Sequence, residues 1–271
     1  MATTGIYRIR GGVPGRERLR VLSRVMEAMT PRLLERIGVG PGARCLDVGC
    51  GGGDVSLALA RLTRPGGAVV GVDIDEVKLQ IARAEAAAAG VANVDYWLAG
   101  VDELPRDGAF DVVYARFLLT HLTEPAVALR AMIGAARPGG VVAVEDVDYS
   151  GGFCHPPCRA YDAFWRLYPR LAAHAGGDAR MGRRLPVLFA AAGLRDVGVH
   201  IEQPAGFDRD VKLLSALTLE NIADAAVAAG LVEPDEIAAH VDELHRFAAR
   251  PETLLSLPRV VQVWARVPAA R

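Results

Sequence analysis

The chain has 271 residues, of which 51% are apolar and 23% charged, so it can bury a sizeable core beneath an ordinary soluble surface. The formal net charge is −1 and aromatic residues make up 6%, which excludes the basic surface and the stacking platform of a nucleic-acid-binding protein. No stretch is apolar enough to span a membrane, and the arginine-rich start lacks the apolar run of a signal peptide. With four cysteines poorly placed for disulfides, these features predict a cytoplasmic protein that binds neither nucleic acid nor membrane.

Short apolar runs alternate with helical patterns between residues 43 and 148. Strands are expected at 43–48, 68–73, 94–98, 110–115 and 141–145, with helices at about 55–61, 76–89 and 124–136. The Pro138-Gly139-Gly140 segment is expected to break the chain before the fifth strand. Continuous apolar strands separated by helices indicate a parallel sheet covered on both faces. The sequence therefore predicts a doubly wound α/β core.

The flanking segments have a more helical pattern. Residues 1–42 are expected to form N-terminal helices or a lid, and residues 149–194 a cap insertion followed by a helix. Residues 195–271 are expected to supply the last two strands, at about 197–202 and 260–267, with a helical insertion at about 207–257. Five aromatic residues of the cap could line an apolar pocket, or could instead pack the cap onto the core: Phe153, Tyr161, Phe164, Trp165 and Tyr168.

A glycine-rich turn from Asp47 to Asp54 lies between the first strand and the first core helix. Glycine suits such a turn because a ligand can lie against a backbone that carries no Cβ atom. The free N–H groups at the start of the helix can meet a carboxylate. Asp73 follows at the end of the second strand, where a carboxylate can accept hydrogen bonds from both hydroxyls of a ribose. The pattern predicts a nucleotide-type site.

Two carboxylates argue against a dinucleotide in this turn. The dinucleotide fingerprint G-x-G-x-x-G places a small residue where this chain has Asp54, at the point where the helix packs onto the sheet. Asp47 would bring negative charge toward a pyrophosphate, whereas the same charge suits a ligand with an ammonium group. Packing and electrostatics both favour a nucleoside that carries an amino acid.

Four motifs, taken in order, resemble the class I S-adenosylmethionine-dependent methyltransferases. They are Asp47-Val-Gly-Cys-Gly-Gly-Gly, Gly71-Val-Asp73, Phe110-Asp-Val-Val-Tyr-Ala and Arg137-Pro-Gly-Gly140, and together they span residues 43–147. The resemblance implies a Rossmann-like, doubly wound sheet of seven strands with a helical cap, in which the sixth and seventh strands are antiparallel. It implies S-adenosyl-L-methionine as cofactor and methyl transfer to oxygen, nitrogen or carbon of a small organic acceptor.

The resemblance also assigns cofactor-binding residues. Gly49 and Gly51 would cradle the methionyl part, with Asp47 assisting the ammonium group. Asp73 would hold the ribose, and Ile74 would lie against the adenine. Further cofactor contacts are expected from Val101 and Asp102 after the third strand, from Arg116 after the fourth, and from Tyr7 near the N-terminus. The family often carries its acidic residue directly after a glycine at the third strand, and Asp102 does not match that position.

Two residues are candidates for catalysis. His121 follows the fourth strand and could act as a general base, or could be a structural histidine at the start of a helix. Glu145 at the end of the fifth strand, with Asp146 and Asp148 beside it, could orient an acceptor or act as base. Hydrogen bonding to loop amides is the other interpretation of these carboxylates.

A metal is not expected, because the Cys154-His155-Pro-Pro-Cys158 segment lacks the second ligand pair that a zinc site needs. The expected partner is a small-molecule substrate, and a homodimer is left open. Two other functions also stay open: a non-methylating reaction such as a cyclisation, and non-catalytic binding of S-adenosylmethionine.

Overall fold

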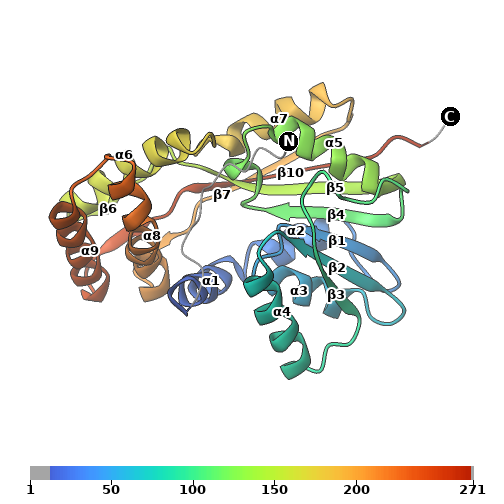
Figure 1. Cartoon of the computed structure of the whole chain (residues 1–271), viewed down its shortest axis with the longest axis horizontal. Coiled ribbons are helices and arrows are strands. Elements are labelled where there is room, and N and C mark those ends of the chain that lie inside the picture. The colour runs from blue at the N-terminus through green and yellow to red at the C-terminus, as the bar shows by residue number, and fades with distance from the viewer. Residues whose placement is uncertain (1–12, 270–271) are drawn as a thin grey trace.

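The computed structural model describes residues 13–269, and a seven-stranded sheet forms the centre of the molecule (Figure 1). The strands β1 to β5 are parallel to one another. In the spatial order β3-β2-β1-β4-β5-β10-β7, they span Val94–Leu98, Ala68–Asp73, Arg44–Val48, Phe110–Arg116, Ala136–Asp148, Arg259–Arg266 and Gly198–Glu202. The predicted doubly wound sheet of seven strands is confirmed.

Two expectations about this sheet need correction. The last two strands are antiparallel to each other, as expected, but among the described strands of the sheet only β10 runs against the core: it pairs antiparallel with both β5 and β7, so β7 has the same direction as the five core strands. The Pro138-Gly139-Gly140 segment does not break the chain, because β5 begins at Ala136 and passes through it as a bulge. The β4–β5 ladder shifts register there, from Phe110↔Ala136 to Val112↔Val141.

Helices cover both faces of the sheet, as expected from the continuous apolar strands. The helices α5 (Pro125–Ala135) and α7 (Met181–Ala191) pack on one face. The helices α2 (Thr30–Arg36), α3 (Asp54–Leu62) and α4 (Glu76–Ala88) pack on the other (Figure 1). Each presents an apolar stripe to the strands, as Leu79, Ala82 and Ala86 do on α4.

A helical cap lies at one end of the sheet (Figure 1). Its helices α1 (Val13–Met26), α6 (Arg159–His174), α8 (Arg209–Ala228) and α9 (Pro234–Ala249) pack into a hydrophobic cluster separate from the two clusters against the sheet. Three short strands, β6 (Cys154–His155), β9 (Leu254–Ser256) and β8 (Ala205–Gly206), add a small antiparallel sheet that the sequence pattern did not predict. Within the described part of the chain, no helix has the length and apolar character needed to cross a bilayer.

Candidate active site

A cavity of about 850 Å³ lies at the carboxyl ends of the core strands, between the sheet and the cap. One half of its wall comes from the segments that follow β1 and β2, and the other half from α1, α6 and α8. Parallel α/β sheets bind ligands in a crevice of this kind. The two halves differ in chemistry: the first carries carboxylates, whereas the second is mainly apolar.

The glycines of the turn after β1 serve two different purposes. A Cβ atom added to Gly51, at φ +54°, would meet no atom within 4 Å, so this backbone faces open space on the cavity wall. A Cβ atom on Gly53, at φ +82°, would come within 2.6 Å of Tyr96 Oη and 2.9 Å of Ala82 Cβ. Gly51 therefore leaves room for a ligand, whereas Gly53 lets α3 pack against its neighbours.

Asp73 closes the same wall at the end of β2. Its Oδ2 accepts a hydrogen bond from the Gly51 amide at 2.9 Å, and its Oδ1 accepts one from the Asp75 amide at 3.0 Å. These bonds fix the carboxylate at the rim of the glycine turn. Ile74 beside it also lines the cavity and is 76% exposed, a large apolar surface that a flat ligand could cover.

Two further carboxylates make this half of the cavity negative. Asp47 is buried, and its Oδ2 accepts a hydrogen bond from Ser56 Oγ at 2.6 Å. Burial raises the pKa of Asp47 to about 6, although the Ser56 hydrogen bond and the Arg116 charge pull the pKa down. Burial also raises the pKa of Asp54, in the first turn of α3. A cation bound here would favour the ionised form of both carboxylates.

Arg116 and Phe117 mark the end of β4 and line the cavity. The Arg116 Nη1 donates a hydrogen bond to Thr30 Oγ1 at 3.1 Å, which ties β4 to the start of α2. Phe117 has φ +55°, a left-handed conformation that is rare for an aromatic residue. Its amide donates to the Glu145 carbonyl at 2.8 Å, and this bond helps to hold the strained residue at the cavity wall.

His121 ends the short 3-10 turn Leu119–His121 and lines the cavity. Burial lowers the pKa of His121 to about 3, and the positive charges of Arg18 and Lys78 act in the same direction. The imidazole is therefore neutral at physiological pH, and in the unliganded protein it is a weak base. Its turn is anchored by Asp146, whose Oδ2 accepts a hydrogen bond from the Thr120 amide at 2.9 Å.

Three of the described sequence-predicted residues are not in this wall. Glu145 is fully buried; its Oε2 accepts from Gln262 Nε2 at 2.9 Å and its Oε1 from the Tyr114 hydroxyl. Val101 packs against the hydrophobic cluster of the α5 face, and Asp102 is exposed; neither lines the cavity. Tyr7 lies outside the described residues. The catalytic role of Glu145 and the cofactor contacts of the other three stay predictions.

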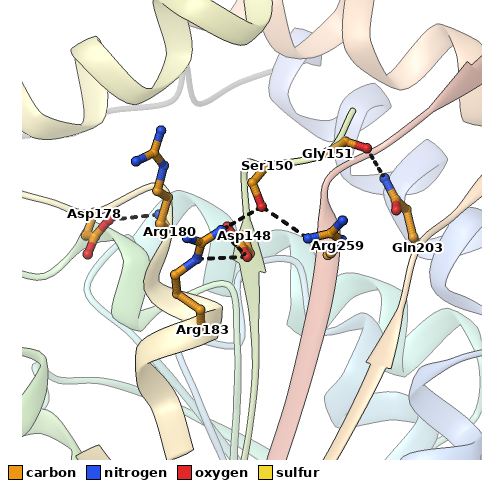
Figure 2. A network of polar contacts seen from close by, with 8 residues as sticks. All are labelled: Asp148, Ser150, Gly151, Asp178, Arg180, Arg183, Gln203 and Arg259. Atoms are coloured by element: carbon orange, nitrogen blue, oxygen red, sulfur yellow. Dashed lines mark hydrogen bonds and ion pairs between the residues drawn. The ribbon is translucent and has the colours of Figure 1, made fainter. Parts of the chain in front are cut away.

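The third carboxylate at the end of β5, Asp148, belongs to a polar network (Figure 2). Arg183 from α7 donates to both oxygens of Asp148, at distances of 2.9 to 3.0 Å, and to Ser150 Oγ at 2.7 Å. Arg259, at the start of β10, reaches the same hydroxyl at 3.4 Å (Figure 2). This carboxylate fixes the segment after β5 to α7, which agrees with a structural interpretation.

The cap aromatics divide between the two roles that were expected of them. Phe164 and Tyr168 line the cavity together with Tyr149, whose ring stacks on Tyr168 with centroids 4.1 Å apart. Tyr161 is buried in the packing of the cap, where its hydroxyl donates to the Ser256 carbonyl at 2.9 Å. Phe153 is 47% exposed and lies outside the lining.

The sequence patterns did not identify the cavity residues of α1 and α8. Arg18 and Leu22 of α1, and Ser215 and Thr218 of α8, belong to the wall. On α1, the apolar residues at 19, 22, 25 and 26 share one helical face, and this spacing could have indicated a buried surface. On α8, the serine and threonine within an otherwise apolar run could have indicated polar groups on a buried surface.

Residues 40–173 match the family model of a methyltransferase domain. The ubiquinone/menaquinone biosynthesis C-methyltransferase UbiE of Vibrio parahaemolyticus is 33% identical over 174 residues, which cover 63% of this chain and 66% of the relative, just under two thirds of its length. The [4+2]-cyclase SpnF has a similar structure, with a TM-score of 0.58 and 22% identity over 90% of this chain and 81% of SpnF. Haemonchus contortus phosphoethanolamine N-methyltransferase 2, solved with S-adenosyl-L-methionine, gives a TM-score of 0.59 and 16% identity over 93% of this chain and 57% of that enzyme. Over residues 40–173 the chain is therefore similar to the methyltransferase domain of class I S-adenosylmethionine-dependent enzymes, and its fold is theirs.

Proposed function

We propose that the protein transfers a methyl group from S-adenosyl-L-methionine to a small organic acceptor. The observation that carries the proposal is the wall made by the glycine turn and Asp73, where an open backbone at Gly51 meets a fixed carboxylate. In this proposal Gly49 and Gly51 hold the methionyl part, Asp47 binds the ammonium group, Asp73 binds the ribose and Ile74 covers the adenine.

The residues on this wall fit the chemistry of such a cofactor. When bound, S-adenosylmethionine supplies an electrophilic methyl group on a positively charged sulfur. Asp47 and Asp54 offer negative charge to a cationic ligand, and burial has already raised their pKa values. Arg116 also lines the cavity, where its positive charge acts on Asp47 and Asp54. His121 is the proposed base because its imidazole lines the cavity; its lowered pKa makes it a weak base until the negative charge that develops on a bound acceptor hydroxyl raises that pKa.

Methyl transfer is favoured over the two other functions. The likeness to the [4+2]-cyclase concerns the fold, whereas the C-methyltransferase is similar in sequence over most of the methyltransferase domain. The mass of the product separates the three functions. Methylation adds one methyl group and yields S-adenosylhomocysteine, a cyclisation consumes no cofactor, and a non-catalytic protein changes neither compound.

We also propose that the protein acts in the cytoplasm on a small molecule. Its four cysteines are free thiols, which supports a reducing compartment such as the cytoplasm. A cavity of this size at the sheet edge suits a small molecule rather than nucleic acid. A homodimer stays a prediction, and size-exclusion chromatography with light scattering would measure it.

Calorimetry with S-adenosylhomocysteine tests the central claim. Asp73→Asn keeps the shape of the side chain but removes its charge, so we expect the affinity to fall by at least about tenfold, the loss of one charged hydrogen bond. Asp111→Asn is the matched control, because Asp111 pairs with Arg137 on the surface, away from the cavity wall. The proposal fails if the wild-type protein binds no better than a folded Asp73→Asn variant.

A further inference from the structure

The buried face of α8 carries a hydroxyl group without a hydrogen-bond partner. Three polar residues follow one another along this helix. The Thr218 hydroxyl donates to the Leu214 carbonyl at 2.7 Å, and the Asn221 Nδ2 donates to the Leu217 carbonyl at 2.7 Å. Ser215 is 2% exposed, yet its Oγ makes neither this helical bond nor any other in the described structure. Buried hydroxyls are rarely left unpaired, because water is lost and nothing replaces it.

The position of Ser215 distinguishes it from the other unpaired groups. The described side chains contain three more buried polar atoms without a partner, on Tyr96, Trp165 and Asn221. None of those three residues lines the cavity, whereas Ser215 does, together with Leu214 and Thr218. The hydroxyl oxygen itself is enclosed in the unliganded protein, so a molecule bound in the cap half of the cavity supplies the missing hydrogen bond once rotation about χ1 turns the Ser215 hydroxyl toward the cavity.

Charge is distributed unevenly along the cavity wall. Among the described residues, the carboxylates of the lining all lie on the cofactor side, at Asp47, Asp54, Asp73, Asp75 and Glu76. The cap side has the guanidinium of Arg18, whose Nε donates to Thr218 Oγ1 at 3.0 Å, one helical turn from Ser215. No described residue of the cap side offers a negative charge to an ammonium group.

The rest of the cap half is apolar. Leu22 of α1, Phe164 and Tyr168 of α6, and Leu214 of α8 all line the cavity, and all belong to the hydrophobic cluster of the cap. Such a surface binds through the apolar area that it buries, while a small number of polar groups fix the orientation of the ligand.

We propose that Ser215 is a substrate-recognition residue whose hydroxyl bonds an oxygen atom of an uncharged, largely apolar acceptor. Arg18 makes the same pocket unfavourable for acceptors that carry an ammonium group. This inference rests on the proposed function, because it assigns the acceptor to the half of the cavity that the cofactor leaves free.

Three probes that share one aromatic ring system test the inference: naphthalene, 1-naphthol and 1-naphthylmethylamine. At pH 7 the phenol is uncharged and the amine is a cation. Their binding to the protein, with and without S-adenosylhomocysteine, is measured by fluorescence titration. We expect 1-naphthol to bind about tenfold more tightly than naphthalene, the usual size of one buried hydrogen bond, and the ammonium probe to bind most weakly.

Ser215→Ala should abolish the preference for 1-naphthol and leave the affinity for naphthalene unchanged. Ser23→Ala is the matched control, because Ser23 lies on α1 outside the lining and should keep the preference. Ser215→Cys, nearly isosteric but a weak donor, should show a reduced preference and replaces the alanine variant if that variant does not fold.

The inference is wrong if the wild-type protein does not prefer 1-naphthol, if Ser215→Ala keeps the preference, or if the ammonium probe binds best. Binding of S-adenosylhomocysteine is measured separately on each variant. Normal cofactor binding without probe discrimination would refute the role of Ser215 and leave the proposed function intact. Failure of cofactor binding would refute the proposed function, while the titration without cofactor would still decide on Ser215.

Discussion

Alanine substitutions at Gly51 and Gly53 should separate ligand binding from stability within one turn. Both glycines have positive φ, so each alanine carries a backbone penalty of about 1–2 kcal/mol. At Gly51 the new methyl group meets nothing within 4 Å and enters the cavity. At Gly53 it collides with Tyr96 Oη and Ala82 Cβ, which adds an overpacking cost of about 1–3 kcal/mol.

Two measurements distinguish the variants. Urea unfolding should give a loss of about 2–5 kcal/mol for Gly53→Ala and of about 1–2 kcal/mol for Gly51→Ala. Calorimetry with S-adenosylhomocysteine should show the reverse order: Gly51→Ala weakens binding by on the order of tenfold or more, while folded Gly53→Ala binds nearly as well as the wild type. Equal stability losses, or normal binding by Gly51→Ala, would refute the assignment of the open backbone to the ligand.

Three further predictions concern buried polar groups. His121→Gln should make the free energy of unfolding less sensitive to acid. The pKa of His121 in the folded protein is about 3, so between about pH 6.5 and 3 the unfolded chain binds a proton that the folded chain does not. The wild type therefore loses stability as the pH falls through this range. Urea unfolding at pH 7.5 and 5 would contradict this if both proteins changed equally. Asp146→Asn should make the free energy of unfolding less sensitive to rising pH. Burial raises the pKa of Asp146 to about 7, so the wild type loses stability as the pH rises from about 4 to 7. The same dependence of unfolding free energy on pH in the variant would count against this prediction. Ser215→Ala should raise the Tm of the unliganded protein by about 2–4 °C, because removal of an unpaired buried hydroxyl gains ~1 kcal/mol. A lower Tm of the variant in calorimetry would argue that the Ser215 hydroxyl makes a stabilising hydrogen bond in the folded protein.

The core strands could be predicted from the sequence because their burial on both faces leaves continuous apolar runs. Residues 68–73 form such a strand with the expected bounds. The edge strand at 94–98 also has the expected bounds, although most of its residues are exposed. The direction of β7 could not be predicted in the same way, because an apolar pattern does not contain the orientation of a strand. The bulge in β5 was missed because Gly139 and Gly140 resemble a break, although their backbone groups pair with Val267.

The candidate site was predictable where it depends on local backbone geometry. The glycine turn follows β1, where its glycines adopt positive φ, and Asp73 ends the neighbouring strand β2, so both could be placed once the strands were predicted. Ser215 was not predictable, since its missing partner is a property of the packed helix. The sequence placed Glu145 correctly at the carboxyl end of β5. Its hydrogen bonds to Tyr114 and Gln262 could not be predicted, because they depend on the register of β5 with its two neighbouring strands.

The separate hydrophobic cluster of the cap has a consequence for the evolution of this protein. Leu22, Phe164, Tyr168 and Leu214 are anchored among other cap residues and not in the clusters against the sheet. These four side chains line the same cavity as the glycine turn but make their packing contacts within the cap, so their substitution leaves the packing of the turn against the sheet intact. Descendants of this chain can therefore exchange one acceptor for another by mutations confined to the cap, while the inherited cofactor wall persists unchanged.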